Sequence, residues 1–361
     1  MSQAGTVIFT MKFAQHVRSL ALWERVGVRE RSGARRHFIV RGGSPRPMIV
    51  SGSPGTGLAQ ALGACTAATV DRAGASICPS ESDPEPMIRF TKMHGLGNDF
   101  VVLDGVRQTL ELSEERIRAL ADRHFGVGCD QVLVVEPAAR PGTDFLYRVF
   151  NADGSEAGQC GNGARCLALF VRDCGLTQKD QLNVGTRDGA IELAIQADGE
   201  VRVNMGVPRL DPRQIPFATE KQATVYVLPL PSETLAIGAV SMGNPHAVTV
   251  VEDVDAAPVA ALGPLIAGHP SFPQGANAGF MQILAADAAR LRVFERGVGE
   301  TLACGSGACA AVVCGRLWGL LEERVDIELP GGTLRIEWSG QDAPVWMTGP
   351  AARVFEGEIA L

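Results

Sequence analysis

Two cysteines stand in nearly identical glycine-rich segments of the chain. Cys160 opens the segment Cys-Gly-Asn-Gly-Ala-Arg-Cys, and Cys304 opens Cys-Gly-Ser-Gly-Ala-Cys-Ala. An earlier pair of segments repeats in the same order, with Gly-Asn-Asp-Phe around Asn98 matched by Gly-Asn-Pro-His around Asn244. The first Asn and Cys are 62 positions apart, and the second Asn and Cys are 60 positions apart. Because both motifs recur in the same order and at nearly the same separation, they indicate an internal duplication.

Each of these cysteines precedes an apolar run with helical character, over residues 165–173 and 309–317. Glycines let a ligand approach the main chain closely. The free N–H groups and the dipole at a helix start attract an anion, and the same position favours the thiolate form of a cysteine. We therefore expect each half to hold an activated sulfur beside a binding position for a carboxylate.

Two such sulfurs facing one carbon atom predict a specific reaction. One sulfur, as thiolate, removes the α-proton of an amino acid, while the other, as thiol, delivers a proton to the opposite face. General acid–base groups contribute a factor of roughly 10²–10⁴, so the backbone N–H groups must also stabilise the charge that spreads into the carboxylate. The pattern predicts a cofactor-independent amino-acid epimerase that uses Cys160 and Cys304 and needs no metal.

Other interpretations explain less of the pattern. A Cys–His hydrolase with His246 as its base would use one cysteine and leave the duplicate without a role. A zinc site does not fit, because Cys304, Cys309 and Cys314 follow one another at intervals of five residues, unlike the usual spacing of zinc ligands. Five further cysteines are interpreted as small buried hydrophobic residues. They are Cys129, Cys166, Cys174, Cys309 and Cys314.

Alternating patterns predict the elements that position these residues. Strands are expected at 88–93, 100–104, 132–136 and 145–150, with short strands between 182 and 205 that turn at two Asp-Gly pairs. Ser113 is expected to cap a helix that runs to about His124. Strand patterns resume at Val225. We infer two homologous halves, 87–206 and 207–361, joined near Pro208, although the final strand could cross back to pair with the first half.

Bulk properties restrict the class of protein. Hydrophobic residues make up 46% of the 361 residues and charged residues 20%, which is typical of a globular protein. The net charge of −7 argues against a nucleic-acid partner. The sequence lacks an apolar run long enough for a membrane span and a secretory signal pattern. Nine cysteines are then interpreted as thiols, so we expect a cytoplasmic protein.

Residues 1–86 differ in composition from the remainder. They carry ten Lys and Arg against six Asp and Glu, and they are rich in Gly, Ser, Pro and Arg. This extension could be a flexible basic arm, an organelle-targeting peptide, or a translation of sequence upstream of the true start. Met87 directly precedes the first strand pattern, which favours the last interpretation.

Residues 87–361 resemble the diaminopimelate epimerases, and the motifs that carry the resemblance are specific. Beyond the two cysteine segments they are Lys-Met-His-Gly-Leu-Gly-Asn-Asp-Phe at 92–100, Phe-Asn-Ala-Asp-Gly-Ser at 150–155, Met-Gly-Asn-Pro-His at 242–246, Asn-Ala-Gly-Phe at 277–280 and Glu-Arg-Gly-Val-Gly-Glu-Thr at 295–301. Nothing comparable covers residues 1–86.

The resemblance implies the fold, the reaction and the roles of individual residues. The implied fold is α/β (α+β), with two pseudo-symmetric domains, each a mostly antiparallel barrel-like sheet around a central helix, and the active site in the cleft between them. The implied reaction interconverts LL- and meso-diaminopimelate in lysine and cell-wall precursor synthesis, and homodimers are common. Cys160 and Cys304 would exchange protons, supported by His246 and Glu295. The implied substrate-binding residues are Asn98, Gln131, Asn151, Gly161, Asn162, Asn244, Asn277, Glu295, Arg296, Gly305 and Ser306.

The implied binding residues suit a substrate with two amino-acid ends. A distal carboxylate fits a bidentate contact with Arg296, and amide side chains donate and accept at once. Proline racemases and hydroxyproline epimerases are related alternatives with the same two-cysteine logic. Their substrates lack a second amino-acid end, which disfavours them here because buried polar groups would lose their partners.

Overall fold

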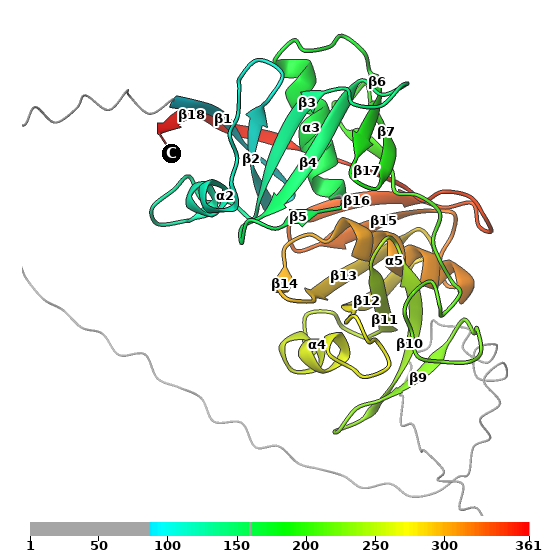
Figure 1. Cartoon of the computed structure of the whole chain (residues 1–361). Coiled ribbons are helices and arrows are strands. Elements are labelled where there is room, and N and C mark those ends of the chain that lie inside the picture. Colours follow the sequence, from blue (N-terminus) through cyan, green and yellow to red (C-terminus); the bar gives the residue numbers. More distant parts are fainter. Residues whose placement is uncertain (1–86, 159, 361) are drawn as a thin grey trace, which may run out of the picture. The chain divides into compact units, whose positions relative to one another are not determined.

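The computed structural model describes residues 87–158 and 160–360 of the chain (Figure 1). The extension 1–86, with all three interpretations of it, lies outside the described residues. The helices are α2 (Glu114–Ala121), α3 (Gly161–Asp173), α4 (Val259–Ala267) and α5 (Gly305–Leu317). The strands are β1 (Met87–Gly95), β2 (Asn98–Asp104), β3 (Gln131–Pro137), β4 (Phe145–Asn151), β5 (Glu156–Ala157), β6 (Gln181–Thr186), β7 (Gly189–Ile195), β8 (Val201–Asn204), β9 (Tyr226–Pro229), β10 (Thr234–Ser241), β11 (Pro245–Val250), β12 (Asn277–Ala285), β13 (Ala288–Glu295), β14 (Gly299–Thr301), β15 (Arg324–Leu329), β16 (Gly332–Glu337), β17 (Trp346–Gly349) and β18 (Ala352–Ala360).

The expected strands of the first half are all present as β1 to β4 and β6 to β8. The helix capped by Ser113 also forms, and the Ser113 side chain accepts the N–H of Arg116. Its expected end at His124 is wrong, because α2 stops at Ala121. Asp122 takes an extended backbone there, and its carboxylate accepts the N–H groups of His124 and Phe125, which replaces continued helical bonding.

The strand pairings repeat between the two parts of the chain. In the first, β2 pairs in parallel with β3, and in the second β11 pairs in parallel with β12. In both cases the paired residues are 31 positions apart, as in Phe100 with Gln131 and His246 with Asn277. The parallel pairs β4–β6 and β13–β15 correspond in the same way, and the other pairings are antiparallel. The duplication inferred from sequence is therefore also a duplication of topology.

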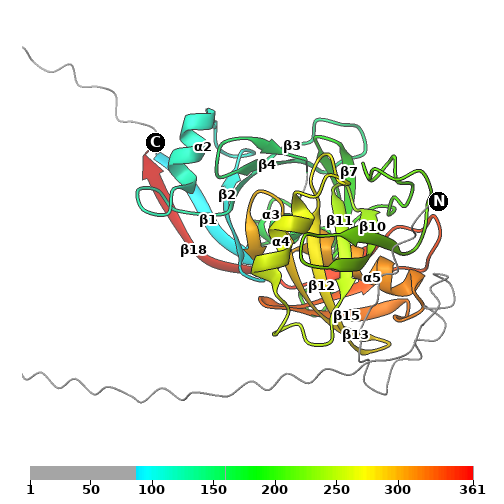
Figure 2. The same cartoon turned by 90° about the horizontal axis from the view of Figure 1, so that it is seen from below.

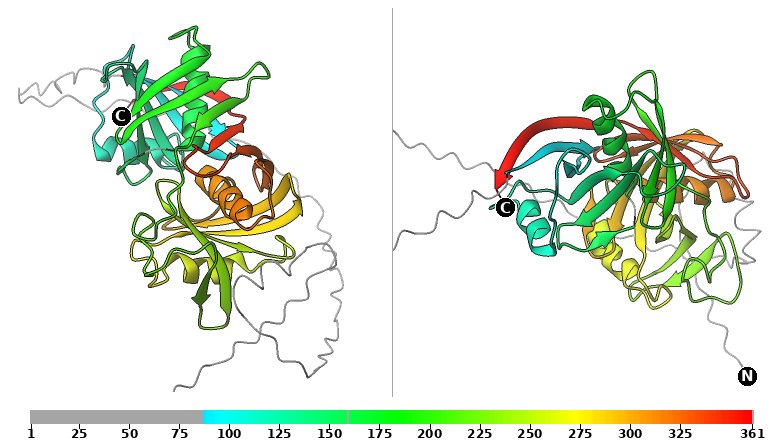
Figure 3. Two further views of the ribbon diagram at one scale, coloured as in Figure 1. Left: turned by 90° about the vertical axis from the view of Figure 1, so that its right-hand side faces the viewer. Right: turned by 45° about the horizontal axis from the view of Figure 1, so that its top comes forward.

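Each repeat encloses one long helix. Figure 1 and the left view of Figure 3 show α3 among the strands of the first repeat and α5 among those of the second. Ten of the thirteen residues of α5 are buried. This fits a helix whose side chains are mostly small and apolar on every side. A continuous cluster of buried side chains packs around both helices, so the two repeats share one hydrophobic core.

The last two strands connect the repeats. β17 follows β16 of the second repeat and pairs with β8 of the first, while β18 pairs with β1 over most of its length. The sequence left open whether the final strand crosses back to the first half. It does: Figures 2 and 3 show β18 lying beside β1. The helices α3 and α5, one from each repeat, are also in contact with each other.

Candidate active site

Both repeated cysteines occupy the N-cap position of a buried helix. Cys160 precedes α3 and Cys304 precedes α5, each with an extended backbone and with no side-chain hydrogen bond to the helix start. The helices begin directly after the cysteines, four residues earlier than the apolar runs suggested. Cys304 is buried and Cys160 is half-buried. The first N–H groups of both helices are therefore left for the sulfurs or for a bound anion.

A chain of hydrogen bonds joins the two cysteine segments. The Cys160 Sγ lies 3.8 Å from the Asn98 Oδ1, and the Asn162 Nδ2 donates to the same oxygen over 3.2 Å. The Asn162 Nδ2 also donates over 3.0 Å to the carbonyl oxygen of Ala303, the residue before Cys304. One buried amide therefore holds the starts of α3 and α5 together, and its own Oδ1 has no partner in the described part of the chain.

The expected shift of both thiols toward thiolate is wrong for this structure. Burial raises the pKa of Cys160, although the N–H groups of Gly163 and Asn162 lower that pKa in part. Burial raises the pKa of Cys304 well above its usual value, and the charge of Glu295 raises it further. Desolvation of the anion therefore outweighs the helix N-terminus, and both groups are thiols at neutral pH in this state.

Glu295 at the end of β13 is the shared neighbour of the two sulfurs. Its charge raises the pKa of both Cys160 and Cys304. Burial raises the pKa of the Glu295 carboxyl itself, while hydrogen bonding by Thr301 and Cys304 opposes that rise. The Thr301 hydroxyl donates to its Oε1 over 2.6 Å. A half-buried carboxyl near both thiols can exchange a proton with them or repel a thiolate.

His246 lies at the start of β11 and is 1% exposed. Its ring Nε2 lies 3.0 Å from the Asn244 Oδ1, which fits a ring N–H that donates to the amide oxygen. Burial, and then the charge of Arg296, lowers the pKa of His246 to about 3. The imidazole is therefore neutral. A Cys–His hydrolase needs its histidine in contact with the nucleophilic cysteine. The ring of His246 contacts Asn244 instead, which gives no support to that interpretation.

Further polar side chains at the strand ends of each repeat are held by local hydrogen bonds. Gln131 and Asn151 make one such contact in the first repeat, and Asn277 and Arg296 make others in the second. Gln131 and Asn151 face each other between β3 and β4, and the Gln131 Nε2 donates to the Asn151 Oδ1 over 2.9 Å. In the second repeat the buried Asn277 accepts the backbone N–H of Arg296 over 3.0 Å. The Arg296 Nη1 donates to the carbonyl of Gln274 over 2.6 Å. Each of these contacts lies within one repeat.

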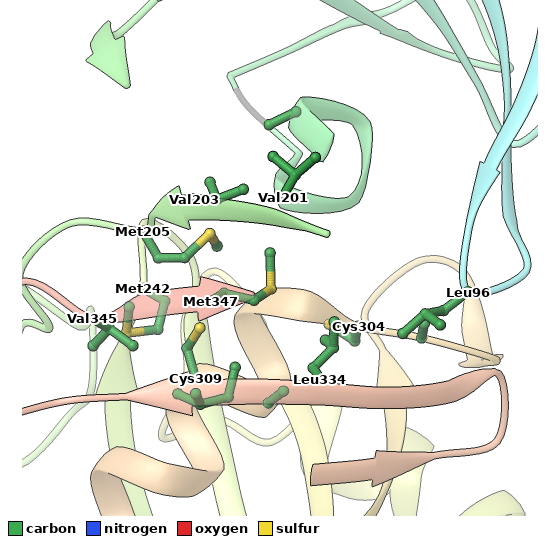
Figure 4. Packing of buried hydrophobic residues seen from close by; sticks show 14 of the residues in the cluster. Leu96, Val201, Val203, Met205, Met242, Cys304, Cys309, Leu334, Val345 and Met347 are labelled. Atoms are coloured by element: carbon green, nitrogen blue, oxygen red, sulfur yellow. The ribbon is translucent and has the colours of Figure 1, made fainter. Parts of the chain in front are cut away.

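Methionine side chains cover the first residue of each helix, so a side chain at either glycine would have to displace a thioether. A Cβ on Gly161 would lie 2.8 Å from the Met347 Cε and 2.9 Å from the Met205 Sδ. A Cβ on Gly305 would lie 2.9 Å from the Met347 Sδ. Figure 4 shows Met347 between Met205 and Cys304. The neighbouring Ser306 places its hydroxyl 3.6 Å from the Cys304 Sγ.

Sequence reasoning missed several residues that shape this junction. Thr301 fixes Glu295, and Asp130 accepts the Asn98 Nδ2 over 2.9 Å, which directs the Asn98 Oδ1 toward Cys160. Thr301 closes the motif at 295–301 but received no role there, and Asp130 lies outside the quoted motifs. Arg165 did carry a sequence signal, because a charged residue there precedes an apolar helical run. The structure shows that its side chain is fully buried.

The family model for diaminopimelate epimerase matches residues 90–210 and 238–354 of the chain. A diaminopimelate epimerase from Thioalkalivibrio sulfidiphilus is 61% identical over 274 residues, which span 75% of this chain and 99% of that protein. Another from Chromobacterium violaceum is 59% identical over 76% of this chain and 99% of its own length. The chain belongs to the diaminopimelate epimerase family. The resemblance noted in the sequence motifs is thereby confirmed.

Solved structures more distant than this family share its fold. A probable proline racemase from Agrobacterium radiobacter gives a TM-score of 0.59 at 16% identity, covering 76% of this chain and 93% of that one. A hydroxyproline epimerase from Agrobacterium vitis gives 0.57 at 16% identity, with the same coverage. These similarities confirm the expected fold class of two pseudo-symmetric α/β domains. In the described residues of this family member, no helix has the length and hydrophobicity of a membrane span.

Proposed function

We propose that this protein interconverts LL- and meso-2,6-diaminopimelate without a cofactor, by proton exchange through Cys160 and Cys304. The observation that carries the proposal is the placement of two cysteines at the N-caps of two equivalent buried helices, with Glu295 beside both. The names of the 61% and 59% identical relatives supply the substrate.

The proton transfers balance as follows. One cysteine, as thiolate, takes the α-proton, and the electron pair left on carbon spreads into the α-carboxylate. The other cysteine, as thiol, gives its proton to the opposite face of the carbon. The two sulfurs have then exchanged protonation states, and exchange with solvent restores the starting state. Because both resting thiols have raised pKa values, the substrate's ammonium and the helix N–H groups must help to form the thiolate.

The substrate-binding roles follow the positions of the polar residues. The N–H groups beginning at Gly161 and Gly305 would hold the reacting carboxylate, with Asn162 and Ser306 beside them. The remaining substrate contacts, much of them at the distal amino-acid end, would come from Asn98, Asn151, Asn244, Asn277, Glu295 and Arg296, with Gln131 nearby. Glu295 would also support catalysis beside the reacting centre. His246, neutral and bound to Asn244, would hold that amide in one orientation.

The wider setting of the enzyme is part of the proposal. A diaminopimelate epimerase would serve lysine and cell-wall precursor synthesis in the cytoplasm, and we propose a homodimer. We propose residues 87–206 and 207–361 as its two halves, with β18 paired to the first half. Proline and hydroxyproline remain the alternative substrates, since proteins of that fold act on them, but similarity at 16% identity shows the fold alone.

The direct test is to incubate the purified protein with LL-diaminopimelate in the absence of cofactor and to follow the meso isomer. In deuterated water, the first product should carry deuterium at the inverted centre while unreacted substrate stays largely protiated. Cys160→Ala and Cys304→Ala should each abolish inversion, and Cys→Ser variants should be severely slowed because a hydroxyl is a weaker acid. Mostly protiated initial product, or an active alanine variant, contradicts the two-cysteine mechanism.

A further inference from the structure

A single arginine is enclosed directly behind the two helix starts. Arg165 lies five residues after Cys160 on α3, and its side chain has no exposed surface. Its Nε donates over 3.0 Å to the carbonyl of Pro350, and its Nη1 lies 3.6 Å from the Met347 Sδ. Its Nη2 has no partner among the described residues, and none of their carboxylates forms an ion pair with it. The guanidinium is therefore a buried cation held only by neutral groups.

The surrounding backbone leaves room for this cation. A Cβ on Gly95, at the end of β1, would lie 3.0 Å from the Arg165 Nη2. Enclosing an unpaired charge is costly, and an apolar side chain of similar volume often gives equal or greater stability. Packing alone therefore does not account for an arginine at this position.

One thioether separates the guanidinium from both helix starts. The Met347 sulfur that contacts Arg165 also covers Gly305, and its methyl group covers Gly161. The charge of Arg165 correspondingly lowers the pKa of Cys160 against the larger effect of burial. The same charge lowers the pKa of Cys309 on α5, where burial is again the larger effect and raises it. The cation thus faces the region where both α3 and α5 begin.

The second repeat has no equivalent cation. Cys309 stands five residues after Cys304, as Arg165 stands five residues after Cys160, and Cys309 is fully buried and uncharged. Arg296, which follows β13, acts on His246. The titratable and charged groups that interact with Cys160, Cys304 or Arg165 are Arg165 itself and Cys166 of α3, Cys304 and Cys309 of α5, Glu295 of β13, Tyr147 of β4, and Glu200 before β8. Arg165 is the only cation in that set.

We propose that Arg165 is the fixed counter-charge of the reaction, a positioning residue that touches neither the substrate nor the reacting sulfurs. Its charge favours the Cys160 thiolate and the negative charge that grows on the substrate carboxylate as the α-proton leaves. The identity of that carboxylate rests on the proposed function, whereas the effect on the thiol does not. Since its hydrogen-bond partners are neutral, the full charge remains available to anions formed at the helix starts.

The test replaces the charge and measures the thiols without substrate. In Arg165→Met, the pH midpoint for iodoacetamide alkylation of Cys160, followed by peptide mass spectrometry, should rise by about one pH unit or more. The thermal midpoint should be unchanged or higher, and kcat/KM for epimerisation should fall about 100-fold. Arg165→Lys should keep the wild-type alkylation midpoint, and Arg165→Gln gives a second uncharged variant if the methionine variant does not fold.

Arg172→Met is the matched control, because it removes the same charge from the last turn of the same helix. It should leave the alkylation midpoint unchanged. An uncharged Arg165 variant that alkylates with the wild-type midpoint overturns the proposal, and so does a control that shifts as much. If the midpoint shifts as expected while the wild-type protein leaves diaminopimelate unchanged, the counter-charge stands and the proposed substrate fails.

Discussion

Burial decides the protonation state of His246 and links that residue to stability. The folded-state pKa is about 3, against an ordinary value of 6.5. Below pH 6.5 the unfolded chain therefore binds a proton that the folded chain does not bind until about pH 3. Stability from this group is present above pH 6.5 and is lost as the pH falls toward 3.

We expect wild-type protein to lose about 2 kcal/mol of unfolding free energy from this group between pH 7.5 and pH 5. His246→Gln removes the titrating group and should reduce the pH-dependent loss by that amount. Urea unfolding at the two pH values, for both proteins, measures the difference. Equal losses in the two proteins would show that His246 is not buried as a neutral ring.

At the scale of elements, the position of Cys160 depends on how α3 begins. The Tyr147 hydroxyl donates over 3.1 Å to the Cys160 carbonyl, which also accepts the N–H of Ala164. A Cβ on Gly163 would lie 2.3 Å from that hydroxyl and 3.1 Å from a methyl group of Leu133. The strand β4 and the helix start therefore fit together only with glycine at position 163.

We expect Gly163→Ala to destabilise the protein by about 1–3 kcal/mol through overpacking. Tyr147→Phe alone should cost about 1 kcal/mol for the lost hydrogen bond. Because the phenylalanine also removes the clashing oxygen, the double variant should be more stable than the sum of the single effects. Thermal unfolding of the wild type, the two single variants and the double variant measures this coupling. If the two single effects simply add, the added methyl group at position 163 does not clash with the Tyr147 hydroxyl.

At the scale of the whole molecule, the residues that match the family model are 90–210 and 238–354. The family model begins at residue 90, and 75% of the chain covers 99% of the first relative. The strand β18 completes the edge of β1, where Phe90 packs edge-to-face on Phe355. The two ends of this region therefore depend on each other, although they are far apart in sequence.

We expect a chain that starts at Met87 to fold and to epimerise at the rate of the full chain. A chain that ends at Pro350 should fail to fold, because losing β18 leaves β1 with an unpaired edge and an exposed apolar face. Circular dichroism and the epimerase assay compare the three proteins. An inactive chain starting at Met87 would show that residues 1–86 contribute to the fold.

The sequence alone determined the duplication, the strands around each motif and the family. Glycine patterns and alternating hydrophobicity are local, so they can be recognised without knowledge of the fold. The tertiary structure decided what depends on burial and on distant contacts. The thiols of Cys160 and Cys304 have raised pKa values because both repeats exclude water from them. The environment of Arg165 is visible only in the tertiary structure, where Met347 of β17 and Pro350 contact its side chain. No local sequence pattern shows whether a buried charge is paired.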